Sequence, residues 1–142
     1  EPGVAYNTTK LADDAARDRI HAAWQAKVAV ADLPGLTHEE RREQFIETDL
    51  EFHRAFLSAV NSELLDQLFA VIEAALGLLL DLQMKAKGYT TVMIGMEESH
   101  LLHEHVYNAF AKGDAAATQD AMHLLIQRAI EDAEQGFLLL KV

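Results

Sequence analysis

The 142-residue sequence predicts an all-α protein. Only two prolines and seven glycines interrupt the chain, and the strong helix formers Ala, Leu, Glu and Gln dominate between them. Within these stretches, apolar residues recur at spacings of three and four, which is the period of a helix with one buried face. The length and a hydrophobic content of 50% suit one well-packed domain over residues 1–142.

The first two helices are expected at 8–32 and from residue 38 to about residue 61. The first ends before Pro34-Gly35, and Thr37 with Glu40 forms a capping box that opens the second. The residues of the first helix expected in the core are Leu11, Ala15, Ile20, Ala23, Trp24 and Val28.

Three further helices are expected in the second half of the chain. The first of them, about 63–84, follows Ser62 and carries leucines around most of its circumference, which predicts a central position. The segment 85–95 is the least regular and is expected to contain a loop. A helix over about 96–112 ends at Gly113, and Asp114 caps a last helix that runs to about residue 139.

Composition excludes several classes of function. A net charge of −11 opposes binding to phosphate backbones, so this chain is not expected to grip nucleic acid through a broad surface. The absence of cysteine excludes disulfides, thiolate metal sites and thiol catalysis. The apolar run 76–82 is far too short to cross a membrane, so we expect a soluble protein.

Asp49 and His53 are the main functional signal. They lie one helical turn apart within a stripe of phenylalanines and aliphatic residues, so both side chains are expected to point inward. A buried carboxylate needs a cation nearby, and a metal ion bound by an oxygen and an imidazole nitrogen would satisfy both groups. An Asp49–His53 hydrogen bond without metal would satisfy them too, and the pair alone leaves both readings open.

The remaining histidines separate by helix face. His103 shares a face with Met96, Val106, Tyr107 and Phe110 and should point inward, and His100 is close enough to reach the same cavity. The histidines expected at the surface are His21, His38 and His105, with His123 at the boundary of the last helix. Three inward groups on two helices, Asp49, His53 and His103, favour a metal site.

Other chemistries match the sequence poorly. A di-iron carboxylate bundle needs two Glu-x-x-His elements, and Glu97 to His100 is the only such element. There is no glycine-rich phosphate loop and no serine nucleophile beside a base in a recognisable pattern.

In order along the chain, the motif elements are the segment Asp49-Leu-Glu-Phe52-His53, the segment Leu57–Asn61, His103 eleven residues before Asp114, and Met122. Together they resemble the FadR-type C-terminal effector-binding (FCD) domain of GntR-family transcriptional regulators, over nearly the whole chain. The resemblance implies an antiparallel bundle of about six to seven helices. It also implies a cytoplasmic regulator, a homodimer when full-length, which reads DNA through an N-terminal winged helix-turn-helix that this chain lacks.

In that family, a divalent metal is commonly bound by the aspartate and histidine of one helix and by two later histidines. Asp49, His53 and His103 match the first three ligands, whereas the fourth position falls on Leu125, which cannot ligate. This departure resembles the subgroup of sugar-acid sensors. Either three protein ligands hold the ion, with water, the effector, His100 or His123 completing its shell, or the site is weakened and often empty.

The resemblance thus implies a sensor that binds a small organic or sugar acid beside a divalent metal, zinc most simply, with nickel or manganese as alternatives. Tyr107 and Arg128 are candidate polar contacts to this effector, although Arg128 is more simply interpreted as a solvated surface residue. No enzyme is expected. Two alternatives stay open: a metal-free helical module that binds an acyl-CoA or a partner helix, and a metal-dependent hydrolase, since three protein ligands plus water is also a catalytic arrangement.

Overall fold

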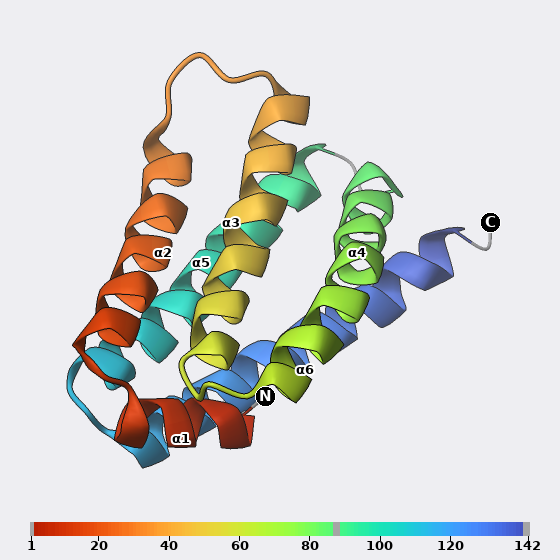
Figure 1. The fold of residues 1–142 in the computed structure, drawn as a ribbon. Coiled ribbons are helices and arrows are strands. Elements are labelled where there is room, and N and C mark those ends of the chain that lie inside the picture. Colours follow the sequence, from red (N-terminus) through yellow and green to blue (C-terminus); the bar gives the residue numbers. More distant parts are fainter. Residues whose placement is uncertain (1, 87–88, 141–142) are drawn as a thin grey trace.

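A computed structural model of the chain, which describes residues 2–86 and 89–140, contains six α-helices packed as one bundle (Figure 1). They are α1 (Pro2–Leu11), α2 (Asp14–Asp32), α3 (His38–Ser58), α4 (Glu63–Ala86), α5 (Tyr89–Ala111) and α6 (Ala115–Leu140). The prediction of an all-α bundle is confirmed. None of these helices, over the residues described, is long and apolar enough to cross a membrane.

The expected single helix over 8–32 is wrong, because the chain turns between α1 and α2. Asp13 has an extended backbone, and its side chain accepts a hydrogen bond of 2.8 Å from the backbone N–H of Ala16. This N-cap starts a new helix and lets α1 cross the end of the bundle (Figure 1). Leu11, expected in the core, ends α1 and is 70% exposed, and Ala15 is exposed as well.

The hairpin between α2 and α3 follows the sequence prediction. Thr37 and Glu40 form the expected capping box. Arg41 extends the cap, because its guanidinium donates to the carbonyl oxygens of Val30 and Leu33, at 3.1 and 2.9 Å, at the end of α2. At the opposite end of α3, the hydroxyl of Thr8 donates to the carbonyl oxygen of Phe56 at 2.8 Å and ties α1 to this helix.

α4 lies at the edge of the bundle, against α3 and α6, and not at its centre (Figure 1). Of the leucines that suggested a central helix, Leu64 is 74% and Leu68 is 52% exposed, and Val71 is 77% exposed. The side chains of Ile72 and Leu79, two further apolar residues of this helix, lie outside the description. Only part of the apolar circumference of α4 is therefore covered by the described part of this chain.

The segment 85–95, which was expected to contain a loop, includes the junction between α4 and α5, although both helices extend further into it than expected, and residues 87–88 between them lie outside the description. α4 continues to Ala86 and α5 already begins at Tyr89. Gly95 alone costs a helix about 1 kcal/mol relative to alanine, and α5 continues through it. The last turn between helices is as predicted: Gly113 has a φ of 74°, and Asp114 accepts a 3.0 Å hydrogen bond from the backbone N–H of Ala117 at the start of α6.

The core lies where α2, α3, α5 and α6 meet. Its largest side chains with no more than 1% exposure include Phe52 and Phe56 of α3, Ile20 of α2, Met122 of α6 and the polar His103 of α5. An imidazole at the centre of an apolar core needs polar partners, and these define the site.

Candidate metal and effector site

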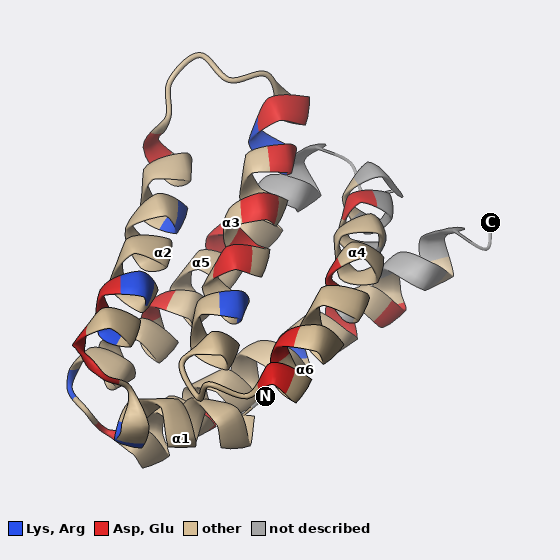
Figure 2. Ribbon diagram, in the orientation of Figure 1, with Lys and Arg blue, Asp and Glu red and all other residues tan. Residues whose placement is uncertain are grey.

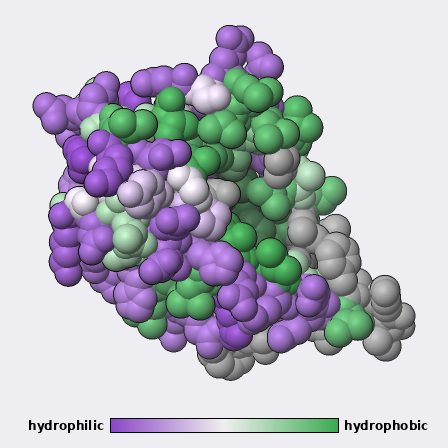
Figure 3. Space-filling model, turned by 90° about the horizontal axis from the view of Figure 1, so that it is seen from below, coloured by the Kyte–Doolittle hydropathy of each residue, from purple (hydrophilic) through white to green (hydrophobic). Residues whose placement is uncertain are grey.

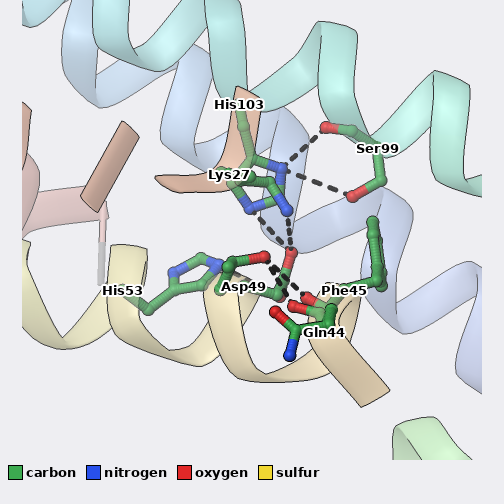
Figure 4. Close-up of polar contacts among 8 residues, drawn as sticks. Lys27, Gln44, Phe45, Asp49, His53, Ser99 and His103 are labelled. Carbon is green, nitrogen blue, oxygen red and sulfur yellow. Dashed lines mark hydrogen bonds and ion pairs between the residues drawn. The ribbon is translucent and has the colours of Figure 1, made fainter. Parts of the chain in front are cut away.

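Asp49, His53 and His103 converge in the core, as the sequence predicted (Figure 4). Asp49 and His53 project from successive turns of α3, and His103 faces them from α5. One ligand atom from each residue lies within 4.8 Å of the other two. One carboxylate and two imidazoles form a donor set that suits zinc, nickel or manganese, so these residues fit a divalent metal ion.

The orientation of His103 is fixed from behind. Its Nδ1 lies 2.7 Å from the carbonyl oxygen of Ser99, one turn earlier on α5, and a carbonyl can only accept. Nδ1 therefore carries the proton, and in the neutral ring Nε2 carries a lone pair. Nε2 is buried, has no hydrogen-bond partner, and points at Oδ1 of Asp49 from 3.1 Å. A backbone carbonyl that accepts the other ring N–H in this way typically orients a metal-binding histidine.

Lys27 of α2 is the residue that sequence reasoning missed. Its Nζ donates to Oδ1 of Asp49 at 2.8 Å, and only 2% of its side chain is exposed. The same ammonium lies 4.4 Å from the ring centroid of Phe45, within the range of a cation–π contact. The sequence does hold a signal for this position, because residue 27 is seven residues after Ile20 and three after Trp24, on the buried face of α2.

These contacts control the charge of the site. Burial is the largest single effect and raises the pKa of Asp49, but the ammonium of Lys27, together with His103 and His53, outweighs it and holds this pKa well below the usual value. Burial, followed by repulsion from Lys27, lowers the pKa of His103 from 6.5 to about 4, against the opposing pull of Asp49. At neutral pH the site therefore holds a carboxylate, a neutral imidazole that faces it, and a lysine cation.

His53 is the third member of the group, and its side chain is 12% exposed, compared with 1% for His103. Its Nε2 lies 3.9 Å from Oδ2 of Asp49, the oxygen that Lys27 does not hold. The His53 ring lies edge-on to the rings of Phe52 and His103, at centroid distances of 6.0 and 5.4 Å. At 3.9 Å this contact is longer than a hydrogen bond, so the direct Asp49–His53 hydrogen bond considered from the sequence is not formed between these two atoms.

A cavity of about 120 Å³ opens beside the three candidate ligands. Leu125 of α6 is 4% exposed and lines it, so the residue at the fourth ligand position of the family pattern does face the site. The other lining residues are mostly apolar, and the polar ones include Ser99, Glu98 and Arg128. Arg128 is half-exposed at this cavity and pairs with Glu98 at 3.2 Å and with Glu131 at 3.3 Å.

The remaining predicted contacts lie away from this cavity. His100 stacks on Trp24 with a centroid distance of 5.1 Å and lines a different cavity. Tyr107 also stacks on Trp24, and its hydroxyl contacts Nδ1 of His21. His123 is exposed on the outer face of α6. The exposed positions expected for His21, His38 and His105 are confirmed.

The charge distribution agrees with the expectation from composition. Acidic residues are spread over most of the helices, and the few lysines and arginines form no continuous stripe on the part of the chain drawn in colour (Figure 2). Several arginines are already paired with carboxylates, among them Arg42 with Asp81 at 2.9 Å and Arg54 with Glu51 and Glu73. The described surface offers no broad cationic face to a phosphate backbone.

A helical bundle that places a carboxylate and two imidazoles beside a small internal cavity has the build of a ligand-binding domain. The model of the FCD domain family matches residues 1–128, and the chain belongs to this family. FCD domains are effector-binding regulatory domains of transcription regulators, a class that is generally not enzymatic. Among curated protein sequences, none matches this chain.

Proposed function

We propose that this domain senses a small organic or sugar acid, which binds in the cavity next to a divalent metal ion held by Asp49, His53 and His103. The observation that carries the proposal is the convergence of these three ligands on one cavity, with His103 oriented by a backbone carbonyl. Zinc suits this donor set best, and nickel or manganese are the alternatives. When bound, the ion would supply a Lewis-acidic contact for a carboxylate or hydroxyl of the effector.

Different residues of this chain would contact the metal ion and the effector. Leu125, in place of a fourth ligand, leaves part of the metal's coordination shell to water or to the effector. Arg128 lines the cavity and is paired with Glu98 and Glu131, so its guanidinium would contact an anionic ligand by exchanging one of these carboxylates for it. Tyr107, His100 and His123 would act at most indirectly, since they line other parts of the molecule.

The size of the cavity favours a small effector over a long acyl chain. A volume of about 120 Å³, at roughly 10–15 Å³ per water, accommodates a compact molecule of several heavy atoms. An acyl-CoA would need a longer apolar channel than this cavity provides.

In the full-length regulator, an N-terminal domain outside this chain would read DNA. The regulator would act in the cytoplasm as a homodimer. The exposed apolar side chains of α4 are the surface that best suits self-association. Leu64, Leu68 and Val71 are each more than half exposed there. The face of the molecule in Figure 3 carries a broad hydrophobic area next to a hydrophilic one.

The proposal is tested by metal content and by thermal shift. After incubation with zinc and dialysis, wild-type protein should hold about one equivalent more than His53→Ala, and His105→Ala, at an exposed position, should match the wild type. A small hydroxy acid should then raise the melting temperature of the zinc-loaded protein, since a ligand at a hundredfold excess over its Kd stabilises the folded state by about 2.7 kcal/mol. Equal metal content in wild type and His53→Ala would refute the site. Stabilisation by long acyl-CoA compounds and not by short acids would favour the acyl-binding alternative.

A further inference from the structure

The candidate metal site already contains a cation that belongs to the protein. Lys27 extends from α2 to Asp49, and only 2% of its side chain is exposed. Buried lysines are uncommon unless they are paired, and the carboxylate of Asp49 is the partner here. Because Asp49 is also the only carboxylate of the metal-binding group, Lys27 and a metal ion need the same residue.

The conflict extends to a single atom. Oδ1 of Asp49 accepts the hydrogen bond of Lys27 at 2.8 Å and is also the oxygen that Nε2 of His103 faces at 3.1 Å. A metal ion shared by His103 and this oxygen would bring a second, divalent cation next to the lysine ammonium. In a site with little solvent, like charges at such a separation repel strongly.

We propose that Lys27 competes with the metal ion for Asp49, so that the lysine-paired and the metal-loaded forms of the site exclude one another. This inference rests on the proposed metal-sensing function. It assigns to Lys27 the role of setting the metal concentration at which the site is filled. The metal binds only by displacing the ammonium, and its affinity is lower than three protein ligands alone would give.

A second cavity next to Lys27 can accept the displaced side chain. This cavity, of about 430 Å³, is lined by Lys27 together with Asp32, Arg41, Glu97 and His100. Phe45 and Met96 line both this cavity and the one beside the metal ligands, so the two are neighbours. The lysine side chain has a flexible four-carbon stem, so its ammonium would turn from Asp49 into the second cavity, whose lining includes the carboxylates of Asp32 and Glu97.

The opposite role would leave a different signature. Ligating carboxylates are often held by a hydrogen-bond donor that improves metal binding, and a lysine that stays on Asp49 while the metal is bound would act in this way. Removing the ammonium then weakens metal binding, whereas removing a competitor strengthens it. The sign of the effect separates the two roles.

The test compares zinc affinity, measured by competition with a chelating dye, for metal-stripped wild type, Lys27→Met and Lys112→Met. Methionine keeps the length of the side chain without its charge, and Lys112 is an exposed lysine beyond the end of α5. We expect zinc to bind Lys27→Met at least tenfold more tightly than wild type, and Lys112→Met to bind it like wild type. An equal or weaker affinity in Lys27→Met overturns the competition.

Two further measurements keep the outcome clear if Lys27→Met folds poorly without metal. Lys27→Gln retains a donor to Asp49 but no charge, and it should show the same increase in zinc affinity. In wild type, zinc should increase the reactivity of Lys27 towards an acylating reagent, as mapped by mass spectrometry. A lysine that stays protected in the zinc-loaded protein contradicts the proposal.

Failure of the inference can be told from failure of the proposed function. If wild type binds zinc and Lys27→Met does so no better, the metal-sensing function stands and the competition is refuted. If only Lys27→Met binds zinc, the competition holds and wild-type sensing does not use this metal. If neither protein binds zinc, nickel or manganese, both proposals are refuted.

Discussion

The hydrogen bond from Nδ1 of His103 to the carbonyl oxygen of Ser99, 2.7 Å long, decides which imidazole nitrogen faces Asp49. Because the proton is committed to Nδ1, the inward Nε2 is an acceptor that faces another acceptor. Such an arrangement is stable only with a cation nearby, which is Lys27 in the metal-free protein. Protonation of Nε2 would replace this arrangement with a second buried charge, and this gives the site a dependence on pH.

The first prediction concerns acid. His103 has a pKa of about 4 in the folded protein against 6.5 otherwise, so the unfolded chain binds more protons below pH 6.5. The stability that this shift represents is fully present above pH 6.5 and is lost as the pH falls towards 4. Between pH 6.5 and 5 the loss is roughly 2 kcal/mol, at about 1.4 kcal/mol per pH unit. The lowered pKa of Asp49 acts in the same direction, but only below about pH 4.

Urea unfolding at pH 7 and pH 5, with a chelator present, measures this loss. His103→Gln removes the titrating group and should reduce the difference between the two pH values. His105→Gln, at an exposed position of the same helix, should leave it unchanged. A wild-type pH dependence retained in His103→Gln would show that other groups control it.

The convergence of Asp49, His53 and His103 could be predicted from sequence because helical periodicity alone places all three on inward faces. Leu125 was placed at the site through the family spacing. Lys27 could not be recognised as easily, since a lysine on a helix is normally expected in solvent. Only the packing of α2 against α3 shows that its ammonium pairs with the buried carboxylate of Asp49. His100 shows what helical periodicity alone cannot predict. The periodicity placed it within reach of the metal ligands, but its ring stacks on Trp24 instead.

The errors in the fold have local and non-local causes. The break between α1 and α2 depends on Asp13, whose side chain prefers a cap to a helix interior, and that signal is present in the sequence. The position of α4 was misjudged for a different reason. A helix that is apolar around most of its circumference is normally central, unless part of that surface is covered by something outside the chain.

A second prediction concerns the capping residue between α1 and α2. Asp13→Ala removes the acceptor of the Ala16 N–H and should lower the free energy of unfolding by about 1 kcal/mol. Asp18→Ala, at an exposed position one turn into α2, is the control and should have a smaller effect. Equal losses in the two variants, measured by urea unfolding, would mean that net charge and not the cap is responsible.

A third prediction uses the leucine at the fourth ligand position. Leu125→His places an imidazole in the cavity that the three candidate ligands share, and it should increase zinc affinity at least tenfold, which corresponds to about 1.4 kcal/mol. The metal-free variant should be less stable than wild type, because a buried leucine is lost from the core. Dye competition measures the first effect and thermal melting the second.

The control for this substitution is Leu124→His. Leu124 is the neighbouring residue but is 51% exposed on the outer side of α6, so its replacement should change neither zinc affinity nor stability by much. Weaker zinc binding in Leu125→His than in wild type would mean that the new ring does not reach the ion.

The last prediction concerns the exposed face of α4. Leu64, Leu68 and Val71 are 74%, 52% and 77% exposed, and their spacing of four and three residues aligns them in one stripe. Burying such a stripe against a second copy is favourable by about 25 cal/mol per Å² of apolar surface, so the isolated domain should self-associate with increasing concentration in sedimentation velocity. The double substitution Leu64→Glu and Leu68→Glu should keep it monomeric without unfolding it, because both side chains are already in solvent. Leu11→Glu changes an equally exposed leucine on α1 and should associate like wild type. Association that survives the double substitution would assign the contact to another surface.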